Sequence, residues 1–173
     1  MAITIDKLRQ TFSEGGAQEI CQDIKSSGDF LGFAKQYVFE SDYRVARSAL
    51  WGLTKSSDKE LSQLQVILNE LIEQSMHTDN SSIRRLTLNI IDRLELTEDN
   101  LRTDFLDFCL DHMVAGDELP GIQTLCMKLA YRMCNFYPEL KEEFKRILEA
   151  MEISYYKSAV KGLRAKILSG GYQ

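Results

Sequence analysis

The chain has 173 residues, of which 44% are hydrophobic and 27% charged, and its formal net charge is −5. This composition is typical of an ordinary globular protein with one sizeable core, so we expect a single domain over residues 1–173. No window approaches the ~20 apolar residues that span a bilayer and the first residues lack the pattern of a secretory signal, so we expect a cytoplasmic protein that does not enter a membrane.

Residues 1–28 form the least regular part of the sequence. Ile3, Ile5, Leu8 and Phe12 are spaced so that they could form one apolar face laid on the helices that follow. We therefore expect an N-terminal helical cap over this range.

From residue 29 to residue 169 the sequence repeats. Four stretches without gaps, which begin at Tyr43, Arg84, Gln123 and Lys157, align at offsets of 41, 39 and 34 residues. Apolar residues recur in them at helical spacing, and other helical segments precede them at similar offsets, so the repeating unit is a pair of helices. The predicted pairs occupy residues 29–56, 57–96, 97–136 and 137–169.

Local signals support these boundaries. Ser57 and Glu60 have the spacing of a capping box, which satisfies free backbone N–H groups where a helix begins. Pro138 suits the first turn of a helix, where its missing N–H costs nothing. No segment alternates apolar and polar residues for more than a few positions, which argues against a β-sheet.

The length of the pairs and their pattern resemble HEAT repeats and the related armadillo repeats. The nearest match is residues 78–91, where a polar turn followed by Ile83 and Arg84 is similar to the HEAT turn and the start of its second helix. The other pairs depart from this match, since Gln123 and Lys157 replace the arginine and no proline interrupts the first helix of any pair. The resemblance implies an all-α fold, a right-handed α-α superhelix (solenoid) of about four HEAT-like helix pairs with an N-terminal cap.

Charge separates the two helices of each pair. The second helices, residues 42–55, 82–96, 121–136 and 155–168, carry +2, +1, +2 and +4, which totals +9. The first helices of pairs two to four, residues 58–78, 98–113 and 138–152, carry −3, −4 and −2, which totals −9. In a HEAT-like solenoid the second helices line the concave face, so the resemblance places the basic layer there, where it would attract anions.

The predicted partner-binding residues lie on outward or flanking positions of the second helices, counted at ~100° per residue. They are Arg44, Arg47, Trp51, Arg85, Asn89, Arg93, Lys128, Tyr131, Arg132 and Lys166. The two aromatic residues favour binding because aromatic side chains are enriched at interface hot spots. Two alternatives stay open: the layers could neutralise each other through ion pairs between helices, and residues 1–28 could cover Trp51.

Chemistry of other kinds finds little support. The four cysteines lack the spacing of a metal site and are expected to be reduced core residues. Asp104, Asp107 and Asp111 share a helix face, but no histidine stands at ligand spacing, and a solvated stripe explains them better. His112 aligns with apolar residues of the other pairs and is expected to be structural. We predict no catalytic residue, no metal and no cofactor.

The leading hypothesis is a non-enzymatic scaffold that binds an acidic segment of a protein partner on its basic second-helix face. Alkylpurine DNA glycosylases also use HEAT-like repeats with a basic concave face, so the alternative is a nucleic-acid-binding protein related to them. This chain is short for that family, is acidic overall and offers no outward tryptophan–aspartate pair that matches its catalytic residues. Both ends of the array look closed, which favours a monomer.

Overall fold

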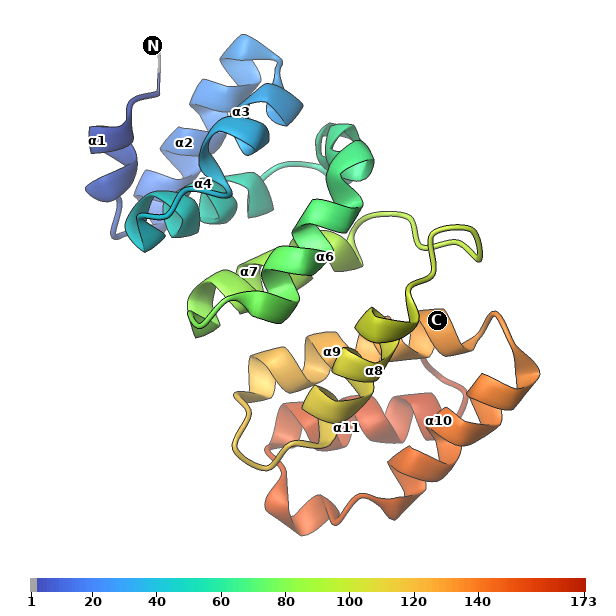
Figure 1. Ribbon diagram of the computed structural model, residues 1–173. Helices are drawn as coiled ribbons and strands as arrows, with labels where there is room; N and C mark the ends of the chain where they lie inside the picture. Colours follow the sequence, from blue (N-terminus) through green and yellow to red (C-terminus); the bar gives the residue numbers. More distant parts are fainter. Residues whose placement is uncertain (1–2) are drawn as a thin grey trace. The chain divides into compact units, whose positions relative to one another are not determined.

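The structure is a computed structural model that describes residues 3–173, and within this range it contains helices and no strand. The chain divides into two compact units, unit 1 up to residue 95 and unit 2 from residue 96 onward (Figure 1). The all-α fold built from helix pairs is thereby confirmed. A single domain over the whole chain stays a prediction.

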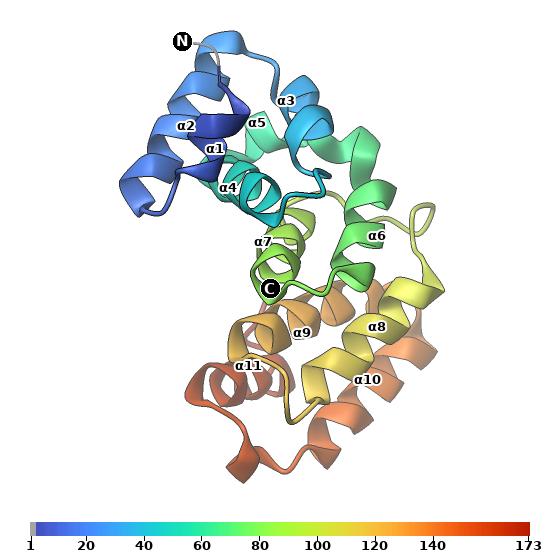
Figure 2. The ribbon, with the colours of Figure 1, turned by 60° about the vertical axis from the view of Figure 1, so that its left-hand side comes forward.

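Unit 1 begins with two cap helices, α1 (Ile5–Arg9) and α2 (Glu14–Ser27). The first pair follows as α3 (Phe30–Tyr37) and α4 (Tyr43–Thr54). The second pair consists of α5 (Asp58–Leu61), the 3-10 segment η1 (Ser62–Ile67), α6 (Leu68–His77) and α7 (Ser81–Asp92). Helix α4 is central, since α1, α2, α3 and α7 all pack against it, and α6 packs along α7 (Figure 2).

The core of unit 1 depends on the close approach of α2 to α4. Val45, Ala49 and Leu53 are spaced by four residues on α4, and all three are buried. At Gly52 there is no side chain, and a Cβ placed there would lie 2.5 Å from Cγ2 of Ile20 on α2. Glycine is therefore required where α2 crosses α4.

The N-terminal cap differs from the expectation at two positions. Leu8 is fully buried, but Phe12 is 72% exposed and Ile5 is 38% exposed. Helix α1 ends at Arg9 and the side chain of Ser13 caps α2, so Phe12 lies in the link between two helices and does not continue the apolar face of α1. The prediction that Phe12 covers the first pair is wrong.

The first helix of the second pair is interrupted. Ser57 and Glu60 form the expected capping box at the start of α5, but the backbone then tightens into the 3-10 segment η1. Side chains of this segment bind neighbouring backbone: Gln63 accepts from the N–H of Phe30, and Gln65 exchanges two hydrogen bonds with the backbone of Glu95. The segment η1 thus contacts the start of α3 in the first pair and the segment that follows α7.

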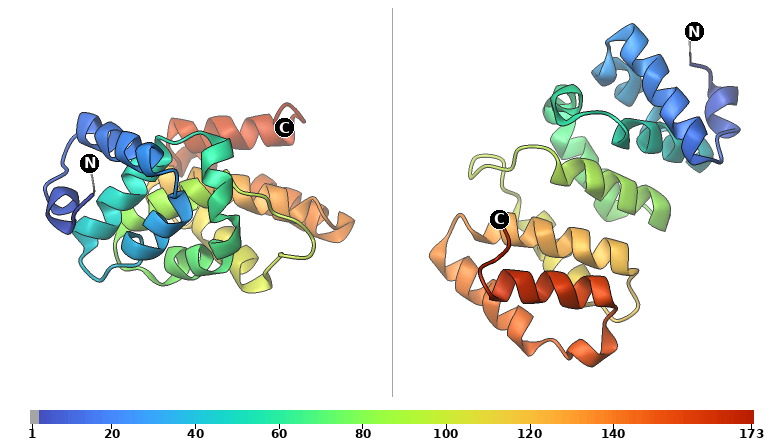
Figure 3. Two further views of the ribbon diagram at one scale, coloured as in Figure 1. Left: turned by 90° about the horizontal axis from the view of Figure 1, so that it is seen from above. Right: turned by 180° about the vertical axis from the view of Figure 1, so that it is seen from behind.

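Unit 2 contains the third and fourth pairs. The third pair is α8 (Thr103–Val114) and α9 (Pro120–Cys134). The fourth is α10 (Pro138–Ala150) and α11 (Ser158–Leu168), joined by the short 3-10 turn η2 (Ile153–Tyr155). Helix α9 is central here, because α8, α10 and α11 all pack against it, and α9 and α11 lie side by side (Figure 3).

In three of the pairs, a side chain of the second helix donates hydrogen bonds to carbonyls at the C-terminal end of the first helix. Arg84 of α7 donates hydrogen bonds to the carbonyls of Ser75, Met76 and Thr78 at the end of α6. Gln123 of α9, at the aligned position, donates to Ala115 O at the end of α8 at 2.8 Å. In the fourth pair Arg164 of α11 donates to Leu148 O at 2.7 Å. The last carbonyls of a helix have no partner inside the helix, so these bonds stabilise the turn of each pair.

Candidate functional site

A pocket in unit 1 gathers three of the predicted partner-binding residues. Its volume is about 250 Å³, and it is lined by Phe12, Arg47, Trp51, Ser82, Arg85 and Leu86. Among the described residues, those that line this pocket include no acidic side chain. Two arginines and two aromatic residues therefore face one hollow with no carboxylate in its wall.

Helix geometry explains why these residues converge. Arg47 and Trp51 are four residues apart on α4 and so lie on the same helix face. Asn80 caps α7 by accepting a hydrogen bond from the N–H of Ile83, which fixes Ser82 and Arg85 in its first turns. Since α4 and α7 pack against each other, the two faces meet at the pocket.

Arg47 is held in place but only partly satisfied. Its Nη2 donates to Thr11 O at 3.3 Å, and its guanidinium lies over the ring of Phe12, 5.9 Å from the ring centroid. This is within the range of a cation–π contact. Its buried Nε finds no hydrogen-bond acceptor among residues 3–173. A guanidinium has five N–H donors, so Arg47 retains donors for a ligand.

Arg85 and Phe12 are the accessible part of the pocket. The side chain of Arg85 is exposed and makes no hydrogen bond or ion pair with any residue in the range 3–173. Trp51 lines the pocket and is half-buried, so residues 3–28 leave it partly accessible. Sequence reasoning missed Phe12 as a site residue, because its apolar character is equally consistent with a core position.

The remaining predicted residues of unit 1 differ in how far they are engaged. Arg44 pairs with Asp42, with Nε 3.3 Å from Oδ1, and Asn89 is half-buried on α7. The Arg93 guanidinium donates to Asp58 Oδ1 at 2.8 Å, to Thr54 O at 2.9 Å and to Ser56 O. The expected alternative, ion pairing between layers, thus applies to Arg93.

Asp42 is the most strongly perturbed carboxylate of this region. It accepts hydrogen bonds from Arg9, with Nε 2.7 Å from Oδ2, and from Arg44. These two guanidiniums lower the pKa of Asp42 from 3.8 to about 2. Arg9 and Arg44 therefore share one carboxylate, which stays ionised near neutral pH.

The other four predicted residues belong to unit 2. Lys128 and Arg132 are half-buried on α9, and Lys166 is exposed on α11. Tyr131 lines a separate hollow of about 420 Å³ between α9, α10 and α11. Its hydroxyl donates to Tyr172 O at 3.2 Å, and its ring contacts the ring of Tyr172 edge-on at 5.2 Å. Tyr131 is thus covered by the segment that follows α11.

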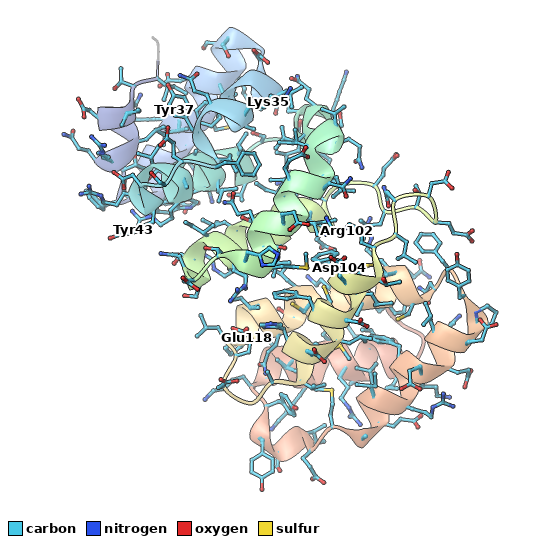
Figure 4. The ribbon with its side chains drawn as sticks, in the orientation of Figure 1. Lys35, Tyr37, Tyr43, Arg102, Asp104 and Glu118 are labelled. Carbon is cyan, nitrogen blue, oxygen red and sulfur yellow. The ribbon has the colours of Figure 1, made fainter. Side chains whose placement is uncertain are left out.

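His112 and Asp104, two polar residues of unit 2 considered above as candidates for chemistry, form local structural pairs. His112 is half-buried, stacks on Phe108 at 3.9 Å between ring centroids, and places Nδ1 2.6 Å from Glu118 Oε2. Arg102 and Asp104 pair at the start of α8 (Figure 4), and the hydrogen bond from Arg102 lowers the pKa of Asp104. Across residues 3–173 no three His, Cys, Asp or Glu side chains are grouped so as to hold a metal ion.

The four cysteines are buried, and none of them forms a disulfide within residues 3–173. Burial, helped by the nearby Glu143 carboxylate, raises the pKa of the Cys134 thiol to about 11. A thiol in this environment stays protonated and unreactive near neutral pH. The expectation that the cysteines are reduced core residues agrees with this burial.

Comparison with known proteins gives one match. The sequence model of the HEAT repeat domain matches residues 4–170, which is nearly the whole chain. No curated protein and no solved structure shows significant similarity. In the part of the chain that the structure describes, every helix is too short or too polar to cross a lipid bilayer.

Proposed function

Since the chain belongs to the HEAT repeat domain family, we propose that it is a non-enzymatic scaffold that binds an acidic segment of a protein partner. HEAT repeats generally mediate protein–protein interaction, and proteins of this family are typically scaffolds without catalytic activity. Family membership supports the general role. The chemistry of the partner is argued from the pocket of unit 1.

The observation that carries the proposal is the uncompensated charge of this pocket. Arg47 and Arg85 line one hollow that contains no acidic residue, and Arg85 is exposed without a partner within residues 3–173. An incoming carboxylate would form charge-assisted hydrogen bonds with these guanidiniums. Phe12 and Trp51 beside them offer apolar surface, so the preferred segment has acidic residues next to an aromatic or aliphatic one.

The remaining predicted residues are expected to differ in how much they contribute to partner binding. Arg44 and Arg93 have acidic partners within unit 1, which supports giving them a smaller part in binding. Lys128, Tyr131, Arg132 and Lys166 in unit 2 stay predicted partner-binding residues, each to be tested by its own variant. The assignment of the basic helices to a concave face also stays a prediction.

A defined peptide tests the proposal. The probe is a fluorescein-labelled peptide Gly-Glu-Phe-Asp-Glu-Gly, and its anisotropy is measured against increasing protein at about 50 and about 500 mM salt, because screening weakens exposed ion pairs. We expect saturable binding that weakens at high salt. Arg85→Glu should weaken binding by about tenfold or more, which corresponds to about 1.4 kcal/mol.

The matched control is Lys35→Glu on α3 (Figure 4). This variant replaces a cation by a carboxylate, so it changes the net charge of the protein by the same amount as Arg85→Glu. Lys35 does not line the pocket. Equal loss of affinity in both variants would mean that net charge alone drives binding, and the pocket would then have no special role.

Two further points belong to the same proposal. We place the module in the cytoplasm, where the buried thiols would stay reduced. We also expect a monomer, which light scattering at several concentrations would show as a constant mass near 19.8 kDa.

A further inference from the structure

The arginines of unit 1 fall into two groups. Arg9 and Arg44 both pair with Asp42, Asp58 pairs with Arg93, and Arg84 donates to carbonyls at the end of α6. Only Arg47 and Arg85 line a pocket without a carboxylate within the described part of unit 1. The pocket thus carries two positive charges that face the same small volume.

We infer that this pocket binds a phosphoserine or phosphothreonine side chain in the partner's acidic segment, with an adjacent apolar residue against Phe12 and Trp51. The inference rests on the proposed function, since it specifies which acidic group of the partner enters the pocket.

Charge balance favours a phosphate monoester over a carboxylate. A phosphorylated side chain carries −1.5 to −2 charges near pH 7 and three acceptor oxygens, whereas a carboxylate carries one charge and two oxygens. Arg47 and Arg85 together supply two charges and many N–H donors, and the hydroxyl of Ser82 adds one more donor at the pocket wall. Guanidinium groups bind phosphate oxygens through paired hydrogen bonds, which suits both arginines.

The guanidinium of Arg47 also has a donor without an acceptor, which supports a phosphate ligand. Its Nε is buried without an acceptor among residues 3–173, although its Nη2 is bonded to Thr11 O. A buried donor without a partner is costly. Since Arg47 lines the pocket, a phosphate oxygen bound there would give its guanidinium an acceptor in addition to Thr11 O.

The same observations disfavour a nucleic acid. Each phosphodiester carries a single charge, and nucleic acids are held by many such contacts along a row of cations. In unit 1, Arg9, Arg44 and Arg93 are paired with carboxylates of the chain itself, and the chain as a whole has a net charge of −5. The two guanidiniums that line the pocket match one terminal phosphate better than a row of phosphodiesters.

Three peptides that differ at one position test the inference. They are fluorescein-labelled Gly-Glu-Phe-Xaa-Glu-Gly, in which Xaa is serine, aspartate or phosphoserine, and anisotropy gives their affinities for the whole chain. We expect phosphoserine to bind about tenfold tighter than aspartate, and aspartate tighter than serine. Arg85→Gln should remove most of the preference for phosphoserine, whereas Lys35→Gln should leave it unchanged.

Arg47→Lys provides a second test, because it keeps the charge but loses the forked donor geometry. Circular dichroism and thermal unfolding confirm that each variant folds before its affinity is used. We expect this variant to lose more affinity for the phosphoserine peptide than for the aspartate peptide, so that its preference for phosphoserine falls at least about threefold.

The outcomes separate this inference from the proposed function. Equal affinity for the aspartate and phosphoserine peptides would overturn the inference and leave the acidic-segment proposal standing. Absence of binding by all three peptides would overturn both. A short single-stranded or duplex oligonucleotide that competes as well as the phosphopeptide would overturn the phosphopeptide assignment in favour of nucleic acid.

Discussion

Replacing Arg93 by alanine should destabilise unit 1, although Arg93 was predicted to bind a partner. The guanidinium of Arg93, at the end of α7, donates to Thr54 O at 2.9 Å, to Ser56 O and to Asp58 Oδ1 at 2.8 Å. These acceptors lie at the end of α4, in the turn that follows and at the start of α5. Arg93 therefore connects the second helix of pair two to the junction between the pairs.

The magnitude follows from the exposure of each partner. Asp58 is 79% exposed, so its ion pair contributes at most about 0.5–1 kcal/mol to the free energy of unfolding. The Arg93 side chain is 24% exposed, and its bonds to the two carbonyls come from a charged donor, so together they contribute about 2 kcal/mol. Arg93→Ala should lower the free energy of unfolding by about 2–3 kcal/mol, or the melting temperature by about 5–10 °C.

Urea denaturation followed by circular dichroism measures this change. The matched controls are Arg85→Ala, which removes an exposed arginine without intramolecular partners among residues 3–173, and Asp58→Asn, which removes only the ion pair. Both should cost less than about 1 kcal/mol. If Arg93→Ala were as stable as Arg85→Ala, the hydrogen bonds from Arg93 to the two carbonyls would contribute nothing to stability. Arg93 would then be a candidate for partner binding again.

Three further outcomes are expected. Gly52→Ala should cost about 1–3 kcal/mol in urea denaturation, since its methyl group would lie 2.5 Å from Ile20 Cγ2, and unchanged stability would contradict the close packing of α2 on α4. Carboxyl-detected NMR should show Asp42 titrating near 2 in place of 3.8, with the midpoint raised by Arg9→Gln. Because the folded pKa is the lower one, the stabilisation by Asp42 is present above about pH 4 and disappears as the pH falls through 2; a midpoint near 4 would refute the ion pairs. Cys134, whose pKa is raised to about 11, should resist a thiol-specific disulfide reagent at pH 8 until the chain is unfolded, and rapid labelling of the folded protein would contradict its burial.

Most of the fold could be predicted because burial follows helical spacing. Ala49, Ile90, Leu129 and Leu163 align in sequence, and all four are buried. The capping box at Ser57 was equally visible, since both of its residues are local. The 3-10 segment η1 could not be predicted, because its side chains bind backbone groups about 30 residues away.

The site could be predicted only in part. Periodicity indicates that Trp51 and Arg85 point away from the core, and both line the pocket. It cannot reveal that Arg93 reaches carbonyls in the preceding turn, because those acceptors belong to the backbone and leave no signal in residue identity. The exposure of Phe12 depends on where α1 ends and α2 begins, and helix ends are poorly specified by sequence.

The most direct test of the proposed binding site uses Trp51, which is the only tryptophan of the chain and lines the pocket. Titration with unlabelled Gly-Glu-Phe-Asp-Glu-Gly should change its fluorescence saturably in wild type and in Lys35→Glu, with the midpoint found by anisotropy. In Arg85→Glu the midpoint should be about tenfold higher or more. A peptide that binds by anisotropy while the fluorescence of Trp51 stays constant would place the binding site elsewhere and contradict the account.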